Sequence, residues 1–139
     1  MQEEKEKKVQ ELYMEFQALD QQIKQLQKQL EALMGQLVEL SVTSNGLEEF
    51  NKIKTEKEVF VPLSSGIFAK ASIKDTSSLL VNVGANVVVQ KDVLSTKKLI
   101  QNQMEELKKI QNQMMNDLER MTSRAAQLEM QLQSLIPQE

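Results

Sequence analysis

Hydrophobic residues in the N-terminal part of the chain recur at alternating spacings of three and four, the pattern of a heptad repeat. Gln, Glu and Lys, which are good helix formers, fill the positions between them. The repeat therefore predicts a coiled-coil helix over residues 1–50. The pattern weakens from Ser41 to Gly46, so the helix either bends or ends there or continues to about Phe50. The apolar core positions are Val9, Leu12, Phe16, Leu19, Ile23, Leu26, Leu30, Leu33, Leu37 and Leu40.

A second heptad repeat covers residues 92–139. Asp92 can accept hydrogen bonds from the free amides of the first helical turn, and Pro137 marks the end of the helix. Only Lys97 and Gln111 interrupt the apolar core positions of this predicted helix. These positions are Val93, Lys97, Ile100, Met104, Leu107, Gln111, Met114, Leu118, Met121, Ala125, Leu128, Leu132 and Leu135.

The two repeats match as the two helices of one antiparallel coiled coil. Val9 would face Leu135, and each facing pair of residue numbers sums to 144 as far as Leu30 with Met114. A shift by one heptad would keep the matching, but the sum of 144 brings the two chain termini together. Gln111 then faces Leu33, as a polar core residue that specifies register at some cost in stability. At 1.5 Å per residue, Val9 to Leu47 would make an arm of roughly 57 Å.

Residues 51–91 have a different period and are predicted to form a linker and two β-hairpins. Four short runs rich in β-branched residues are separated by turn-forming segments. Pro62 lacks an N–H and is expected at a strand end, while Gly84 or Asn86 can supply the positive φ of a tight turn. The runs are 58–62, 67–73, 79–83 and 87–89.

Four short strands cannot bury both faces and leave open edges, so the hairpins are expected to pair with strands of other chains. The predicted fold is α+β: a long antiparallel two-helix coiled coil joined by two β-hairpins that form an oligomeric β-barrel platform. The residues expected at the subunit interface are Val59, Val61, Ile67, Phe68, Ile73, Leu79, Leu80, Val81, Val83, Val87, Val88 and Val89.

Composition removes several classes of function. The chain has 139 residues, no Cys and no His, which excludes thiol and imidazole chemistry, so no catalytic residue, metal or cofactor is expected. The net charge of -3 argues against nucleic-acid binding. The charged N-terminus does not resemble a signal peptide, and no apolar run is long enough for a membrane span. The expected location is the cytoplasm.

The order of helix, hairpins and returning helix resembles the prefoldin family over nearly the whole chain. The resemblance rests on 59–63, 66–71 and 79–91, the last being a valine-rich stretch around Gly84 that runs into the second helix. Two hairpins imply the alpha type, which in the family dimerises through its strands and carries four beta-type subunits. In one departure, Ser64 and Ser65 precede Gly66 where family members often have Gly directly after Pro-Leu.

The resemblance implies an ATP-independent chaperone subunit that binds unfolded polypeptides at the free ends of its helices and delivers them to a group II chaperonin. The sequence has no G-x-x-x-x-G-K-[ST] nucleotide motif. A structural or filament-forming coiled-coil protein without client binding would share the architecture. The residues expected to contact clients, called the tip residues below, are Val9, Leu12, Tyr13, Met14, Met130, Leu132, Leu135 and Ile136.

Isolated exposed apolar residues are common on any protein, which weakens the case for any single tip residue. Five other apolar residues lie off the core positions without lying near the predicted tip: Met34, Val38, Leu99, Ile110 and Met115.

Overall fold

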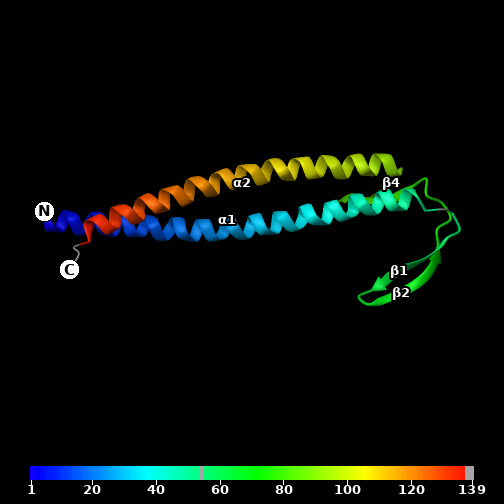
Figure 1. Cartoon of the computed structure of the whole chain (residues 1–139), viewed down its shortest axis with the longest axis horizontal. Helices are drawn as coiled ribbons and strands as arrows, with labels where there is room; N and C mark the ends of the chain where they lie inside the picture. Colours follow the sequence, from blue (N-terminus) through cyan, green and yellow to red (C-terminus); the bar gives the residue numbers. More distant parts are fainter. Residues whose placement is uncertain (54, 137–139) are drawn as a thin grey trace. The chain divides into compact units, whose positions relative to one another are not determined.

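A computed structural model describes residues 1–53 and 55–136 (Figure 1). Along the chain, two β-hairpins lie between two long helices. This order confirms the predicted fold class, apart from barrel closure between chains. Pro137, the expected helix end, lies outside the described residues, and the second helix ends at Leu135. The elements are α1 (Gln2–Asn51), β1 (Glu58–Ser64), β2 (Ile67–Ser72), β3 (Leu79–Gly84), β4 (Val87–Lys91) and α2 (Val93–Leu135).

Helix α1 is continuous through Ser41 to Gly46, so the second of the two alternatives for this segment is correct. The hydroxyl of Thr43 donates to the backbone carbonyl of Glu39 at 2.9 Å, and the helix absorbs this polar side chain without breaking. A glycine in a helix interior costs about 1 kcal/mol relative to alanine. The partly buried residues Leu47 and Phe50 continue the apolar stripe beyond Gly46, and their packing offsets that cost.

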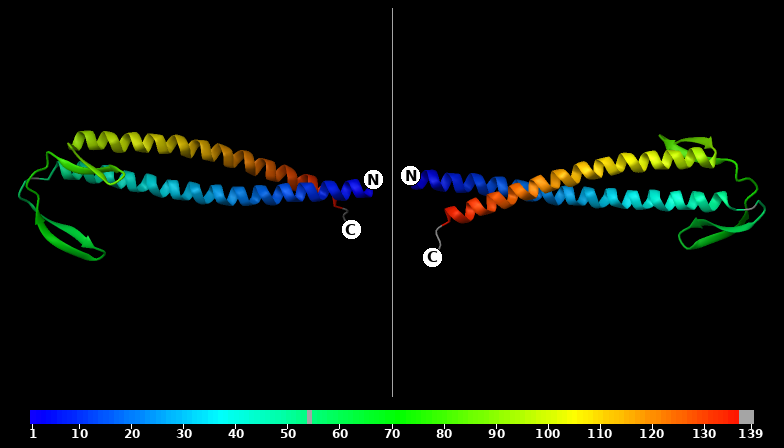
Figure 2. Two further views of the ribbon diagram at one scale, coloured as in Figure 1. Left: turned by 180° about the vertical axis from the view of Figure 1, so that it is seen from behind. Right: turned by 45° about the horizontal axis from the view of Figure 1, so that its top comes forward.

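The chain divides into two compact units. The first unit contains residues Met1–Gln36 of α1 and Leu107–Glu139. Within it the two helical segments run side by side in opposite directions in every view (Figures 1 and 2). Every predicted core position of these segments is buried or partly buried, and Leu128 is 0% exposed. The heptad pattern thus identifies the side chains that hold this unit together.

The second unit contains residues Leu37–Glu106 and therefore both hairpins. Val93, Thr96 and Ile100 are its buried residues at the start of α2. The ammonium of Lys97, one of the two polar interruptions of the repeat, lies 3.2 Å from the carboxylate of Glu48. This ion pair accounts for a lysine at a core position.

Strands β1 and β2 form an antiparallel sheet of two strands. The sequence predicted Pro62 at a strand end, but this residue lies inside β1 opposite Phe68. The prediction was wrong because β1 has a partner on one side only and its register shifts between Pro62 and Ser64. Edge strands and bulges are the places where a sheet tolerates proline. Ser65 and Gly66 make the turn, with a φ of 80° at Gly66.

Strands β3 and β4 form the second two-stranded sheet, in which Val81 lies opposite Val89. Both candidates for positive φ have it, Gly84 at 110° and Asn86 at 61°, and Ala85 also has a φ of 50°. Positive φ at two successive residues is what a type I′ hairpin turn requires. The Asn82 side chain supports this turn by accepting a hydrogen bond from the Gly84 amide at 2.9 Å.

Asp92 caps the N-terminus of α2, as the sequence predicts. Its carboxylate accepts a hydrogen bond from the Ser95 amide at 2.7 Å. Hydrogen bonds from the Ser95 side chain and backbone lower the pKa of the Asp92 carboxyl from its ordinary value of 3.8. The folded chain therefore favours the ionised form of the cap.

This cap predicts a pH dependence of stability. A depressed pKa in the folded state stabilises the fold above the unfolded value of 3.8, and this contribution is lost as the pH falls through the folded pKa. Asn caps a helix about as well as Asp but does not ionise in this range. We expect the melting temperature of the natural chain to fall relative to Asp92→Asn between about pH 5 and about pH 2. Circular dichroism measures both, and a constant difference would contradict the role of this carboxylate.

Candidate functional site

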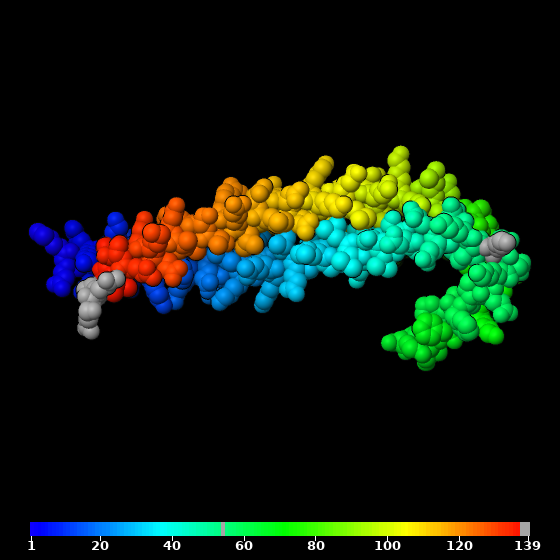
Figure 3. Space-filling view, in the orientation of Figure 1, coloured from blue at the N-terminus to red at the C-terminus, as the bar shows by residue number. Residues whose placement is uncertain are grey.

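The tip residues all lie in the first unit, where the first turns of α1 and the last turns of α2 meet. The side chains at the off-core positions are exposed: Tyr13 by 53%, Met14 by 63%, Met130 by 71% and Ile136 by 55%. Figure 3 shows that the N-terminal residues of α1, in blue, project beyond the last turn of α2, in red. Four large apolar side chains are thus presented to solvent at one end of this unit.

The other four tip residues belong to the core between the helices. Leu12 is buried with 9% exposure, while Val9, Leu132 and Leu135 are partly buried. A client would reach Leu12 only where the helix ends separate. The eight predicted residues therefore divide into an exposed set that is accessible in the folded state and a core set that depends on fraying.

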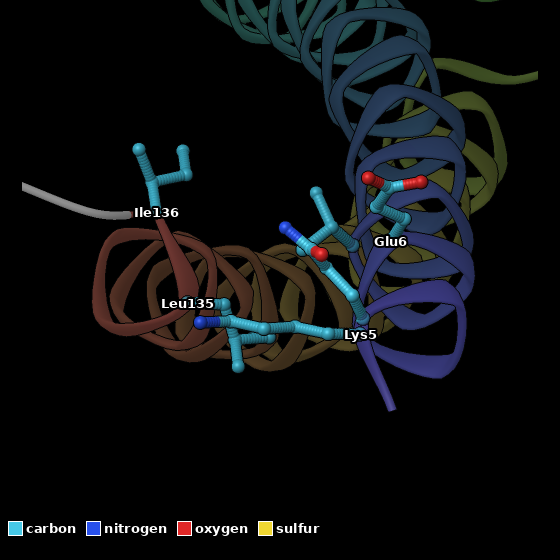
Figure 4. A pocket seen from close by; sticks show the side chains of 6 residues that line it. Lys5, Glu6, Leu135 and Ile136 are labelled. Atoms are coloured by element: carbon cyan, nitrogen blue, oxygen red, sulfur yellow. The ribbon is translucent and has the colours of Figure 1, made fainter.

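A cavity of about 340 Å³ opens between the start of α1 and the end of α2. Figure 4 shows the Lys5 side chain extending from α1 toward Leu135, with Ile136 on the other side of the end of α2. Val9 and Leu135, which the sum of 144 places opposite each other, both line it. The lining residues are Gln2, Lys5, Glu6, Val9, Leu135 and Ile136.

Sequence reasoning missed Gln2, Lys5 and Glu6 as members of this site. The signal was present, because the heptad repeat extended backwards from Val9 puts its next two core positions at Lys5 and Gln2. Long polar side chains at core positions do not fill the space between two helices as leucine does. The apolar core therefore opens into a cavity where the repeat turns polar.

An ion pair joins the two helices beside the tip residues, with Glu15 directly following Met14. The guanidinium of Arg124 donates to one carboxylate oxygen of Glu15 at 3.1 Å and 3.2 Å. Both side chains are 44% exposed, so solvent screens the pair, and pairs of this kind contribute about 0.2–1 kcal/mol. The Leu128 side chain, fully buried one turn away, contributes far more to holding these helix ends together.

The second candidate surface is the pair of hairpins in the second unit. Seven of the twelve predicted interface residues are exposed, and the other five are partly buried. In the second hairpin, Leu80 and Val88 lie on the exposed face, whereas Val81 and its partner Val89 are partly buried. The exposed seven are Val61, Ile67, Phe68, Leu80, Val83, Val87 and Val88; the partly buried five are Val59, Ile73, Leu79, Val81 and Val89.

Two exposed residues of β1, Phe60 and Leu63, were missed as interface candidates. Phe60 lies opposite Lys70 and Pro62 opposite Phe68, which places Phe60 and Phe68 on one face of the first hairpin. Alternation places Phe60 on the same face of β1 as Pro62, and the pairing of Pro62 with Phe68, an expected interface residue, would have identified it. Apolar surface is thus exposed on both hairpins.

The described residues offer little other chemistry. Within 1–53 and 55–136, no three acidic side chains come close enough to hold a metal ion together. Neither helix has a segment of the length and apolarity needed to cross a bilayer, over the residues described. The tip residues and the exposed residues of the hairpins are both apolar surfaces.

The chain resembles proteins of one family. The family model described as prefoldin subunit matches residues 19–138. A prefoldin subunit alpha from Thermofilum pendens is 28% identical over 83% of this chain and 89% of its own length. One from Archaeoglobus fulgidus is 30% identical over 77% of this chain and 83% of its own length.

A solved structure has the same fold. It is a chain of filamentous PFD from Methanocaldococcus jannaschii, determined by cryo-EM, with a TM-score of 0.74 and 18% identity. The match covers 81% of this chain and 93% of that chain. The two-helix and two-hairpin arrangement is therefore shared with a known structure.

Substitutions at two nearby residues of α2 distinguish a buried side chain that holds the helix ends together from an exposed side chain at the tip. Leu128→Ala removes a fully buried side chain and should lower the free energy of unfolding by about 2–5 kcal/mol. Met130→Ala changes an exposed side chain and should stay within about 0.5 kcal/mol of the natural chain. Urea unfolding followed by circular dichroism measures both. Equal effects of the two substitutions would show that Leu128 does not hold the helix ends together.

Proposed function

The chain belongs to the prefoldin family, and on that premise we propose that it is an ATP-independent subunit that holds unfolded polypeptides at its tip residues. The family is a non-enzymatic chaperone family, and its members assemble with other prefoldin subunits. The match to alpha subunits makes this chain an alpha-type member. The observation that carries the proposal is the exposure of Tyr13, Met14, Met130 and Ile136 at one end of the first unit.

The chemistry of these side chains suits clients of varied sequence. Burial of apolar surface is non-directional and contributes about 25 cal/mol per Å². Methionine adds an unbranched, polarisable side chain that adapts to different partners. One tip offers only a few such side chains, so each contact is weak and a client can leave without nucleotide hydrolysis. Several tips acting on one client would raise the effective concentration and with it the overall affinity.

Substituting the four exposed tip residues tests this proposal. The combined variant Tyr13→Gln, Met14→Gln, Met130→Gln and Ile136→Gln removes apolar surface without touching the buried core. Each apolar side chain buried against a client contributes about 1.5 kcal/mol or more, so the concentration needed to suppress aggregation should rise about tenfold or more. Light scattering of a chemically denatured client on dilution measures this concentration.

A matched control replaces the same number of exposed apolar residues at other positions. Val38, Val42, Leu94 and Ile110 are also exposed, and none of them is a tip residue. Their combined replacement by Gln should leave suppression unchanged. Equal loss in both variants, or no loss in either, would contradict client binding at the tip.

For assembly, we propose that two copies of this chain pair through their hairpins and carry four beta-type subunits, forming a hexamer. The open edges of both two-stranded sheets support this, because unpaired strand edges are templates for strands of another chain. The exposed Phe60, Phe68, Leu80 and Val88 would be buried in such a platform. We further propose that the complex acts in the cytoplasm without binding nucleic acid or membranes, and delivers clients to a group II chaperonin.

Charged substitutions on the exposed face of β3 and β4 test the assembly. Leu80→Glu with Val88→Glu should prevent complex formation, because burying two unpaired carboxylates costs several kcal/mol each. Gln90→Glu places a charge at an exposed polar position of that face, opposite Leu80, and serves as a milder comparison. Native mass spectrometry with a one-hairpin partner measures the complex, which should contain two copies of this chain and four of the partner. Open-ended growth of mass with concentration would favour the filament-forming alternative instead.

A further inference from the structure

A lateral groove lies on the first unit, away from the tip residues. Its volume is about 560 Å³, which is within the range of about 300–1,000 Å³ typical of ligand sites. Leu30 of α1 lines one side, and residues of α2 from Met115 to Ala126 line the other. Met115 is 51% exposed, so the groove presents apolar surface that no described part of the chain covers.

The lining of the groove is apolar with a single charge. Leu30, Met115, Leu118 and Ala126 supply the carbon surface. The Thr122 hydroxyl donates to the Leu118 carbonyl at 2.7 Å and so is already bonded within the helix. Glu119 is the one charged residue of the lining, and its neighbour Arg120 outside the lining is paired with Asp117. The groove therefore favours an apolar ligand that brings a positive charge.

The dimensions of the groove fit an extended chain. Met115 and Ala126 are separated by about 16 Å along the helix at 1.5 Å per residue. An extended peptide rises about 3.3 Å per residue, so roughly five residues cover this distance. The small side chains of Ser123 and Ala126 allow the backbone of a bound peptide to approach closely.

We propose that this groove is a second client site, which binds a short extended apolar segment carrying a lysine or arginine next to Glu119. The proposal rests on the proposed function, since an unfolded polypeptide is the partner that supplies such segments. It extends that function by giving the chain a preference for basic apolar sequences, which the tip residues alone do not provide.

An introduced thiol reports on the groove directly, because the natural chain contains no cysteine. Ala126→Cys is made in the full-length chain assembled with a one-hairpin partner, and its rate of maleimide labelling is measured. The probes are acetyl-Leu-Val-Lys-Leu-Val-amide and the same peptide with Glu in place of Lys. An exposed ion pair contributes up to about 1 kcal/mol, so the lysine peptide should protect the thiol up to about fivefold better.

Two further variants make the result specific. Gln113→Cys places the thiol at an exposed position outside the groove lining, where neither peptide should slow labelling. Adding Glu119→Lys to Ala126→Cys should reverse the preference between the two peptides. Equal protection by both peptides, protection at both thiol positions, or slow labelling at Ala126→Cys before any peptide is added would overturn the proposal. The last outcome would mean that another subunit covers the groove.

The aggregation assay separates this proposal from the proposed function. If the natural chain suppresses aggregation but shows no peptide preference at the groove, the second site is wrong and tip binding stands. If the natural chain fails to suppress aggregation, the proposed function is wrong, and the second client site fails with it even where peptides protect the thiol.

Discussion

The packing of two heptad repeats from opposite ends of the sequence is the interaction on which the other features depend. Leu12 and Leu128 are buried only because α1 and α2 run antiparallel within the first unit. That pairing decides which apolar residues are enclosed and which are left in solvent. Tyr13 and Met130 are exposed because each lies one or two positions from a buried leucine on the same helix. The exposed surface is therefore a by-product of the core register.

Much of this arrangement could be predicted because heptad spacing constrains burial directly. Every predicted core position of α1 and α2 is buried or partly buried, including the polar Gln111 and Lys97. Lys97 shows the limit of the pattern, since its pairing with Glu48 depends on a contact between residues distant in sequence. The cavity beside Lys5 was missed for a related reason: a repeat is recognised by its apolar residues, so its polar continuation was not followed.

Local rules predicted the hairpins less accurately than the helices. Pro62 has no N–H to donate to a neighbouring strand, which is why it was expected at a strand end. β1 has a neighbour on one side only, and an edge strand tolerates a residue without this donor. The weak pattern from Ser41 to Gly46 similarly left two alternatives, because helix propensity is a small term that packing overrides. The heptad pattern did not predict how accessible each tip residue is, since a position in the repeat describes direction around a helix and not the exposure to solvent at the helix end.

The turn at Gly84 to Asn86 has a consequence for the strand that follows it. β4 begins with three successive valines, so its first residues would be equally apolar if the strand slipped by one residue and exchanged its two faces. Side-chain alternation therefore does not fix the pairing register of β3 and β4 at that end of the hairpin. The left-handed backbone conformation of Ala85 and Asn86 in the turn must fix this register. An insertion of one residue there would move Gln90 and Lys91 to the opposite faces of the sheet, while the valines would keep both faces of the strand apolar. The hydrophobic pattern of the sequence would not reveal this change, but the structure of the sheet would.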